Sequence, residues 1–120
     1  MTRKDQIREY KETKLPMGLF IIKNTANGKV LIGSSVNLPA ILNRMKSQLE
    51  MGGHPNRILQ EEWNQLGADS FTFEVLDTLN HSDVLDYNPA KDLEALMELW
   101  MEKLSPYENR GYHSLPGSKV

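Results

Sequence analysis

Two histidines and two glutamates are the residues whose chemistry the sequence first brings into question. His54 and His113, with Glu61 or Glu62, could bind a metal ion if the fold brought them together. Histidines this far apart have no metal-ligand spacing, and helix-cap or surface roles are more common for them. The chain has no cysteine, which excludes disulfides, thiolate catalysis and cysteine-ligated zinc. The residues therefore give no metal site.

A second group of side chains could contact phosphates without cutting them, because it combines positive charge with small hydroxyl and amide groups. Its members are Lys23, Lys29, Ser34, Ser35, Asn37, Arg44, Lys46 and Arg57. They lie in a half of the chain, residues 1–67, with ten Lys/Arg against six Asp/Glu, whereas residues 68–104 have two against nine. The net charge of −2 argues against strong indiscriminate binding of nucleic acid. The alternatives are an ordinary surface around capping residues and a solvated acidic face.

A β-hairpin must position the first of these residues. Apolar runs at 19–22 and 30–32 flank Asn27-Gly28, a dipeptide that readily enters the positive φ values of a tight turn. The connection from Lys23 to Lys29 exceeds two residues, so we expect a bulge or a wider loop.

Helices and one further strand follow the hairpin. Asn37 and Pro39 predict the start of a helix that ends near Glu50, and Gly67 ends a second helix whose inner face has Ile58, Leu59, Trp63 and Leu66. The alternation of Phe71, Phe73 and Val75 predicts a half-buried strand over 71–76, and residues 77–92 a loop. A third core helix carries Leu93, Leu96, Met97, Trp100, Met101 and Leu104. Residues 2–14, with Ile7 and Tyr10, predict a short helix that docks on the body.

The predicted fold is therefore α+β, with a small, mostly antiparallel three-stranded sheet flanked by helices in the order β-β-α-α-β-α. We expect an amino-terminal helical extension over 1–16, one domain over 17–113 and a tail over 114–120. No apolar run approaches the roughly 20 residues of a membrane span, and no secretory leader is visible, so we expect a cytoplasmic protein without membrane contact.

The hairpin and helices resemble the GIY-YIG nuclease superfamily. Gly18-Leu19-Phe20 and Leu31-Ile32-Gly33 stand where its two triplets stand, and Asn27-Gly28-Lys29 is similar to its usual turn. The pattern from His54 to Gly67 is similar to one common among its phage and homing-type members, and the resemblance continues to Gly111-Tyr112. It implies the family's fold and, for active members, DNA hydrolysis with one divalent metal ion.

This sequence departs from the family at the positions to which the resemblance assigns chemistry. Phe20 and Leu31 replace two tyrosines, Ile41 an arginine on the first helix, Met45 a histidine or tyrosine, Met97 the metal-binding glutamate, and His113 the asparagine of a closing Gly-Tyr-Asn. Phosphodiester hydrolysis needs a metal or cationic group to offset developing charge and a group to orient water. We therefore predict a divergent member that is catalytically inactive and needs no cofactor.

Two functions remain open for such a domain. The first is a binding or interaction module. It would make weak DNA or RNA contact, or take an apolar protein partner or small ligand in an apolar cleft lined by Phe20, Leu31, Ile41 and Met97. The alternative is an active endonuclease that uses Mg²⁺ or Mn²⁺ and relocated residues. Arg44 lies three residues after Ile41 and Glu94 three before Met97, so each shares a helix face with the position it would replace.

Overall fold

Three antiparallel strands form the centre of the molecule, for which a computed structural model describes residues 15–80 and 87–114. The strands are β1 (Met17–Asn24), β2 (Val30–Ser35) and β3 (Phe71–Leu79), and their order in the sheet is β2-β1-β3. The α+β class and the three-stranded sheet that the sequence predicted are confirmed.

Some predictions lie outside the described residues. They are the helix expected within 2–14, and with it most of the extension 1–16, and all of the tail 114–120 except its first residue. Among the described helices, none combines the length and the apolar character that crossing a membrane requires.

The predicted hairpin joins β1 to β2, with Ile21 opposite Ile32. Its loop spans more than two residues, as expected. The Asn24 amide donates to the Lys29 carbonyl over 2.9 Å, and the Gly28 amide donates to the Asn24 carbonyl over 2.8 Å. Gly28 has φ +80°, which a side chain would disfavour.

Asparagines begin both helices that follow the hairpin, α2 (Leu38–Glu50) and α3 (Arg57–Leu66). The side-chain oxygens of Asn37 and Asn56 each accept a hydrogen bond from the backbone amide three residues on, which satisfies a donor that the helix cannot pair. Gly67, with φ +87°, ends α3 as predicted and leads through a short 3₁₀ turn (Ala68–Ser70) into β3.

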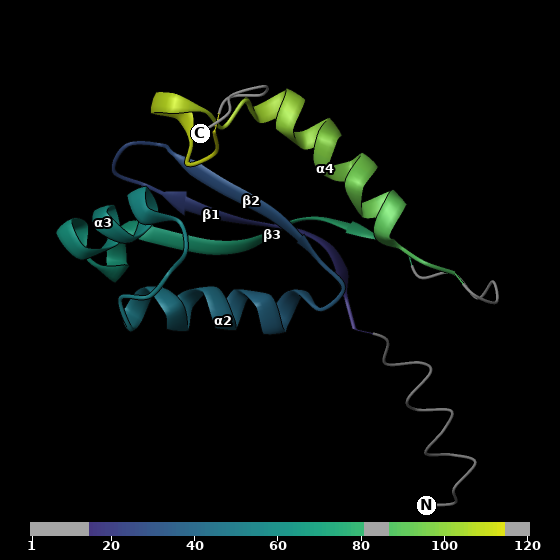
Figure 1. Cartoon of the computed structure of the whole chain (residues 1–120), viewed down its shortest axis with the longest axis horizontal. Helices are drawn as coiled ribbons and strands as arrows, with labels where there is room; N and C mark the ends of the chain where they lie inside the picture. Colours follow the sequence, from purple (N-terminus) through teal and green to yellow (C-terminus); the bar gives the residue numbers. More distant parts are fainter. Residues whose placement is uncertain (1–14, 81–86, 115–120) are drawn as a thin grey trace, which may run out of the picture.

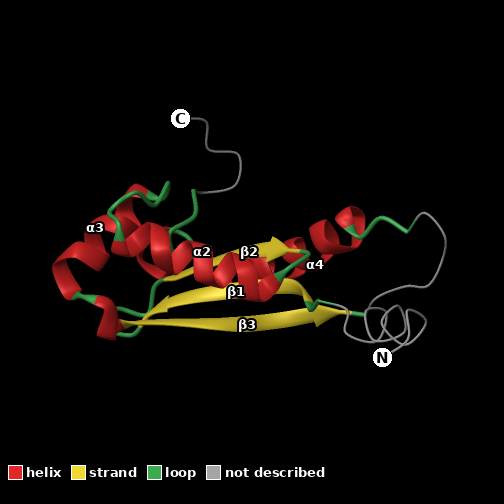
Figure 2. Ribbon diagram, turned by 90° about the horizontal axis from the view of Figure 1, so that it is seen from below, coloured by secondary structure: helices red, strands yellow, loops and turns green. Residues whose placement is uncertain are grey.

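Helices cover both faces of the sheet. Helix α2 lies on one face and α4 (Ala90–Leu104) on the other, near the β2 edge (Figures 1 and 2). The main core lies on the α2 side, where the sheet packs against α2, α3 and the chain after α4. Its buried members are Phe20, Ile22, Leu31, Leu38, Leu49, Leu59, Trp63, Phe71 and Tyr112.

The inner face predicted for α3 is partly wrong. Leu59 and Trp63 are buried, but Ile58 is 52% exposed and Leu66 is 45% exposed. Gln60 is buried in their place because its side chain has polar partners: it accepts from the His54 amide and donates to the Leu49 carbonyl. The spacing of apolar residues alone does not identify a buried polar residue whose hydrogen bonds are satisfied.

Strand β3 is longer than predicted, and the prediction that Val75 points inward is wrong. Val75 is 47% exposed. Leu19 pairs with Asp77 but its neighbour Phe20 pairs with Val75, so β3 has one extra residue at this point. Such a bulge shifts the alternation of side chains between the two faces. The predicted loop over 77–92 is also too long, because β3 continues to Leu79 and α4 begins at Ala90.

Helix α4 is less buried than a core helix. Leu93 is its one buried residue, while five others are half-buried: Leu96, Met97, Trp100, Met101 and Leu104. The prediction that these five are core residues is therefore wrong. The Trp100 indole Nε1 donates to the Asp77 carboxylate over 2.9 Å, so the ring joins α4 to β3 at the surface.

The chain after α4 returns to the edge of the sheet. A short 3₁₀ turn (Glu108–Arg110) precedes Gly111, which forms a parallel bridge with Val30. The Tyr112 amide donates to the Val30 carbonyl over 3.1 Å. The chain after α4 thereby covers the first part of the β2 edge, and the second part, toward Ser34, adjoins α4.

Candidate functional site

A cleft of about 470 Å³ opens where β1, β2 and α2 meet the loop before α3. We call it the hairpin cleft. It is lined by Phe20, Leu31, Ile32, Gly33, Ser34, Ile41, Met45, His54, Pro55 and Asn56. Four of the positions that the family resemblance marked as catalytic thus face one cavity, and all four carry apolar side chains.

Phe20 and Gly33 make the floor of the hairpin cleft. They pair across β1 and β2, and the Phe20 ring lies directly against the glycine. A Cβ atom on residue 33 would come within 2.5 Å of the Phe20 Cζ atom, closer than real Cβ contacts allow. The lack of a side chain at Gly33 therefore leaves the space that the Phe20 ring occupies.

His54 is the one ionisable side chain among the described residues that line the hairpin cleft. Its Nδ1 accepts from the Asn56 amide over 2.9 Å, so the proton of the neutral ring is on Nε2, which lies 3.0 Å from the Met45 sulfur. Burial lowers the pKa of His54. Both ring nitrogens have partners, which leaves neither to act on a substrate or to bind a metal ion.

A second hollow, of about 660 Å³, lies along α4 on the other side of the β2 edge. We call it the α4 groove. Its lining consists of Ser34, Ala90, Glu94, Met97, Glu98, Met101, Glu102, Ser105 and Tyr107. Ser34, on the edge strand β2, lines both hollows. Met97, the fifth marked position, is in the α4 groove and not in the hairpin cleft.

The divalent metal ion that the fold family implies does not fit the described residues. Across 15–80 and 87–114, no three His, Cys, Asp or Glu side chains are grouped so that they could hold a metal ion. His113, another marked position, uses Nε2 to accept the Ile32 amide over 3.0 Å, and burial lowers its pKa. Glu61 is exposed, and Glu62 is held by the polar contacts described below.

The residues that could contact phosphates fall into two groups. Ser35 and Asn37 are engaged at the start of α2, since the Ser35 hydroxyl accepts the Asn37 amide and the Asn37 side chain caps the helix. Lys29 forms an ion pair with Glu62, at 3.1 Å. The remaining members are exposed: Lys23, Ser34, Arg44, Lys46 and Arg57. They come from three elements and the β2 edge.

The two residues of the relocation alternative do not border a common cavity. Glu94 lines the α4 groove, whereas Arg44 is exposed on α2 and lines neither hollow. The sheet separates α2 from α4 (Figure 1).

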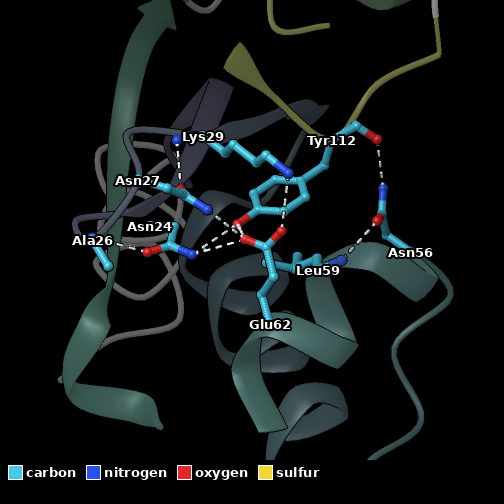
Figure 3. A network of polar contacts seen from close by, with 8 residues as sticks. All are labelled: Asn24, Ala26, Asn27, Lys29, Asn56, Leu59, Glu62 and Tyr112. Atoms are coloured by element: carbon cyan, nitrogen blue, oxygen red, sulfur yellow. Dashed lines mark hydrogen bonds and ion pairs between the residues drawn. The ribbon is translucent and has the colours of Figure 1, made fainter. Parts of the chain in front are cut away.

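Sequence reasoning missed a polar network around Glu62 that joins three distant segments (Figure 3). Glu62 Oε1 accepts from the Asn24 amide group (2.9 Å), the Asn27 amide group (2.8 Å) and the Tyr112 hydroxyl (2.8 Å). Glu62 Oε2 accepts from Lys29 Nζ over 3.1 Å. One carboxylate on α3 thereby holds both the hairpin loop and the chain after α4.

The electrostatics of the network agree with an ionised carboxylate. Burial raises the pKa of Glu62, but hydrogen bonds from Asn27, Tyr112 and Lys29, with the lysine charge, outweigh burial and leave that pKa below its ordinary value. Burial, with the neighbouring carboxylate, raises the pKa of Tyr112, which keeps its hydroxyl protonated as a donor. The available signal was Asn24, a polar residue at the end of a buried strand, because such a residue needs partners.

The antiparallel sheet, the hairpin at its start and the helices α2, α3 and α4 define the fold of GIY-YIG nuclease catalytic domains. Two solved structures share this fold. The catalytic domain of the homing endonuclease I-TevI is 26% identical, with a TM-score of 0.65, and the match covers 80% of this chain and 95% of that one. A mutant of the catalytic domain of the intron endonuclease I-TevI is 25% identical, with a TM-score of 0.63, over 76% and 86% of the two chains. No family model matches the sequence, and neither does any curated protein.

Proposed function

We propose that this domain is a binding module with a nuclease fold that does not hydrolyse phosphodiesters. The observation that carries the proposal is the lining of the hairpin cleft, where Phe20, Leu31, Ile41 and Met45 lie together. Aliphatic, aromatic and thioether side chains neither orient a water molecule nor offset the charge that develops on a phosphate.

The absence of charge from the hairpin cleft is the energetic part of this proposal. A single electrostatic contribution to a transition state is commonly worth about 3 kcal/mol. Replacing an arginine and a metal-binding carboxylate removes two such electrostatic contributions, which lowers the rate of hydrolysis by about four orders of magnitude. The resemblance assigns these two roles to Ile41 and Met97, which lie in different hollows. His54 does not compensate, because both of its ring nitrogens are already engaged.

Contact with DNA or RNA is the second candidate function. It is favoured by the fold, since both structural neighbours are endonuclease catalytic domains, and by exposed Arg44 and Lys46 on α2. These cations could hold a phosphate backbone beside the hairpin cleft without cutting it. Such binding would weaken steeply with salt, because each contact releases counterions.

A cleavage assay tests the proposal. Supercoiled plasmid and single-stranded DNA are incubated with the protein and Mg²⁺ or Mn²⁺, next to an Arg44→Ala/Glu94→Ala variant. We expect no cutting above a mock preparation from the same expression host, for either protein. Metal-dependent cutting that the double variant abolishes would establish the relocated nuclease and overturn the proposal.

A binding assay tests the second candidate separately. A labelled DNA duplex is titrated at several salt concentrations with the protein and with an Arg44→Ala/Lys46→Ala variant. Binding that falls steeply with salt and is weakened at least about tenfold in the variant would support DNA contact through α2. Binding equal in the two proteins would exclude this face.

A further inference from the structure

The α4 groove combines an apolar floor with an acidic rim. Met97 and Met101 are half-buried and form the floor, and Tyr107 lines it beyond the end of α4. Glu94, Glu98 and Glu102 line the same groove and are exposed to solvent.

The spacing of these residues makes the apolar floor and the acidic rim run parallel along α4. Glu94, Glu98 and Glu102 are four residues apart, so their side chains follow one another along one side of α4. Met97 and Met101 have the same spacing and form an adjacent row. The row of carboxylates extends over eight residues, or about 12 Å of helix.

The lining of the α4 groove has no cation to offset these charges. Its described residues include three carboxylates and neither lysine nor arginine. Lys103 lies on the same helix, but its Nζ is 5.0 Å from the centre of the Trp100 ring, and it does not line the groove. Like charges four residues apart weaken a helix, so the stripe does not stabilise the free domain.

We propose, resting on the binding role proposed above, that the α4 groove binds a basic amphipathic helix of a partner protein. The apolar face of such a helix would pack on Met97 and Met101, whose flexible thioether side chains adapt to varied apolar surfaces. Lysines or arginines beside that face would meet the carboxylates of Glu94, Glu98 and Glu102. A helix of about two turns matches the length of the stripe.

Charge separates this partner from nucleic acid. A phosphate backbone in the α4 groove would approach three carboxylates with no cation among the described lining residues, which is unfavourable. A cationic helix gains from the same charges. Because the exposed cations of α2 lie on the other face of the sheet, DNA contact there would leave the α4 groove free.

Peptide binding tests the proposal. The probe is a fluorescein-labelled peptide of about 18 leucines and lysines, arranged so that the leucines share one face of a helix. The matched probe has glutamate at every lysine position. We expect the lysine peptide to bind the full chain at least about tenfold more tightly than the glutamate peptide, with salt-dependent affinity.

Two double variants locate the binding. Glu98→Lys/Glu102→Lys should weaken the lysine peptide by about tenfold or more, since it reverses the rim. Glu50→Lys/Glu61→Lys makes the same change in net charge at exposed positions that line neither hollow, and should change affinity by less than about twofold. Met97→Ser/Met101→Ser should also weaken binding, and its thermal unfolding should stay close to that of the wild type because both side chains are only half-buried.

Several results would overturn the proposal. They are absence of lysine-peptide binding, equal binding of the two peptides, and equal effects of the rim and control variants. Sedimentation that shows a dimer broken by Glu98→Lys/Glu102→Lys would assign the groove to a second copy instead. Peptide anisotropy does not depend on cleavage, so a failure here and a failure of the proposed function are distinguishable.

Discussion

Replacing Glu62 by alanine should destabilise the domain strongly, because the carboxylate satisfies buried donors. Asn24 is fully buried and Tyr112 is 5% exposed, and both donate to Glu62 Oε1. Leaving a buried donor unpaired costs about 1–3 kcal/mol. Asn24 retains a second acceptor, the Tyr112 hydroxyl oxygen at 3.2 Å, whereas the Tyr112 hydroxyl proton loses the acceptor that Glu62 provides. We expect a loss of about 2–4 kcal/mol in the free energy of unfolding.

Glu62→Gln should cost less and should identify the role of charge. Glutamine retains one oxygen for Asn24, Asn27 and Tyr112 but presents an amide to Lys29 Nζ, so two donors face each other. We expect a loss of about 1 kcal/mol. Urea unfolding at pH 7, followed by tryptophan fluorescence, measures both variants.

The dependence of the free energy of unfolding on acidic pH tests the role of the Glu62 charge independently. Because the pKa of Glu62 is lowered in the folded state, its contribution is fully present above the ordinary value near 4.5 and is lost as pH falls through the folded value. Glu62→Gln should remove this part of the loss. Glu61→Ala is the matched control: Glu61 is the neighbouring residue, and its exposed ion pair with Arg57 at 3.7 Å should contribute less than about 0.5 kcal/mol. If Glu62→Ala costs no more than Glu61→Ala, the reasoning about buried donors is refuted.

Three further changes test other contacts. Gly33→Ala should cost about 1–3 kcal/mol in urea unfolding because its Cβ would collide with the Phe20 ring, and adding Phe20→Leu should cancel most of that cost; additive losses would contradict the collision. Burial lowers the folded-state pKa of His113, so the free energy of unfolding should fall as pH drops below about 6.5 and level off below the folded-state pKa. His113→Gln can accept a hydrogen bond from the Ile32 amide without titrating, so it should reduce this loss. An unchanged acid response in the variant would count against the contact. Asn37→Ala should cost about 1 kcal/mol and Asn37→Asp much less, and equal losses would show that the cap does not matter.

The parts of the fold that were predictable from the sequence depend on local signals. Asn27-Gly28 turns the hairpin, Asn37 caps α2, and Gly67 ends α3, each through contacts or dihedral angles within a few residues. Such features need no knowledge of the rest of the chain. The resemblance to the nuclease family rests on the same segments, so it predicted the fold correctly.

The errors arise where distant segments meet. Val75 was expected inside, but the bulge opposite Leu19 and Phe20 depends on how β3 pairs with β1, which apolar alternation does not encode. Apolar periodicity identified the correct face of α4 but not how much of that face the rest of the domain covers. A sheet of three strands leaves Met97 and Met101 half-buried.

The candidate site was predictable in part. The resemblance predicted one cleft lined by Phe20, Leu31, Ile41 and Met97, and the hairpin cleft contains the first three, together with Met45. It did not reveal that Met97 faces a separate groove. The network around Glu62 has partners up to 50 residues away in sequence and follows no periodic pattern, so the one sequence signal for it is the polar Asn24 at the end of a buried strand.

The two hollows share Ser34 in their linings but differ in charge, and this bears on which molecules can bind. The hairpin cleft is apolar, with a neutral His54, and the adjoining α4 groove carries the carboxylates of Glu94, Glu98 and Glu102. A DNA strand in the hairpin cleft would exchange hydration for an apolar surface, and one in the α4 groove would meet negative charge, and neither contact is favourable. A cationic, amphipathic segment has the reverse preference on both counts. The apolar lining of the hairpin cleft and the carboxylate stripe on α4 therefore both disfavour a polyanion, and both would favour a cationic, amphipathic segment.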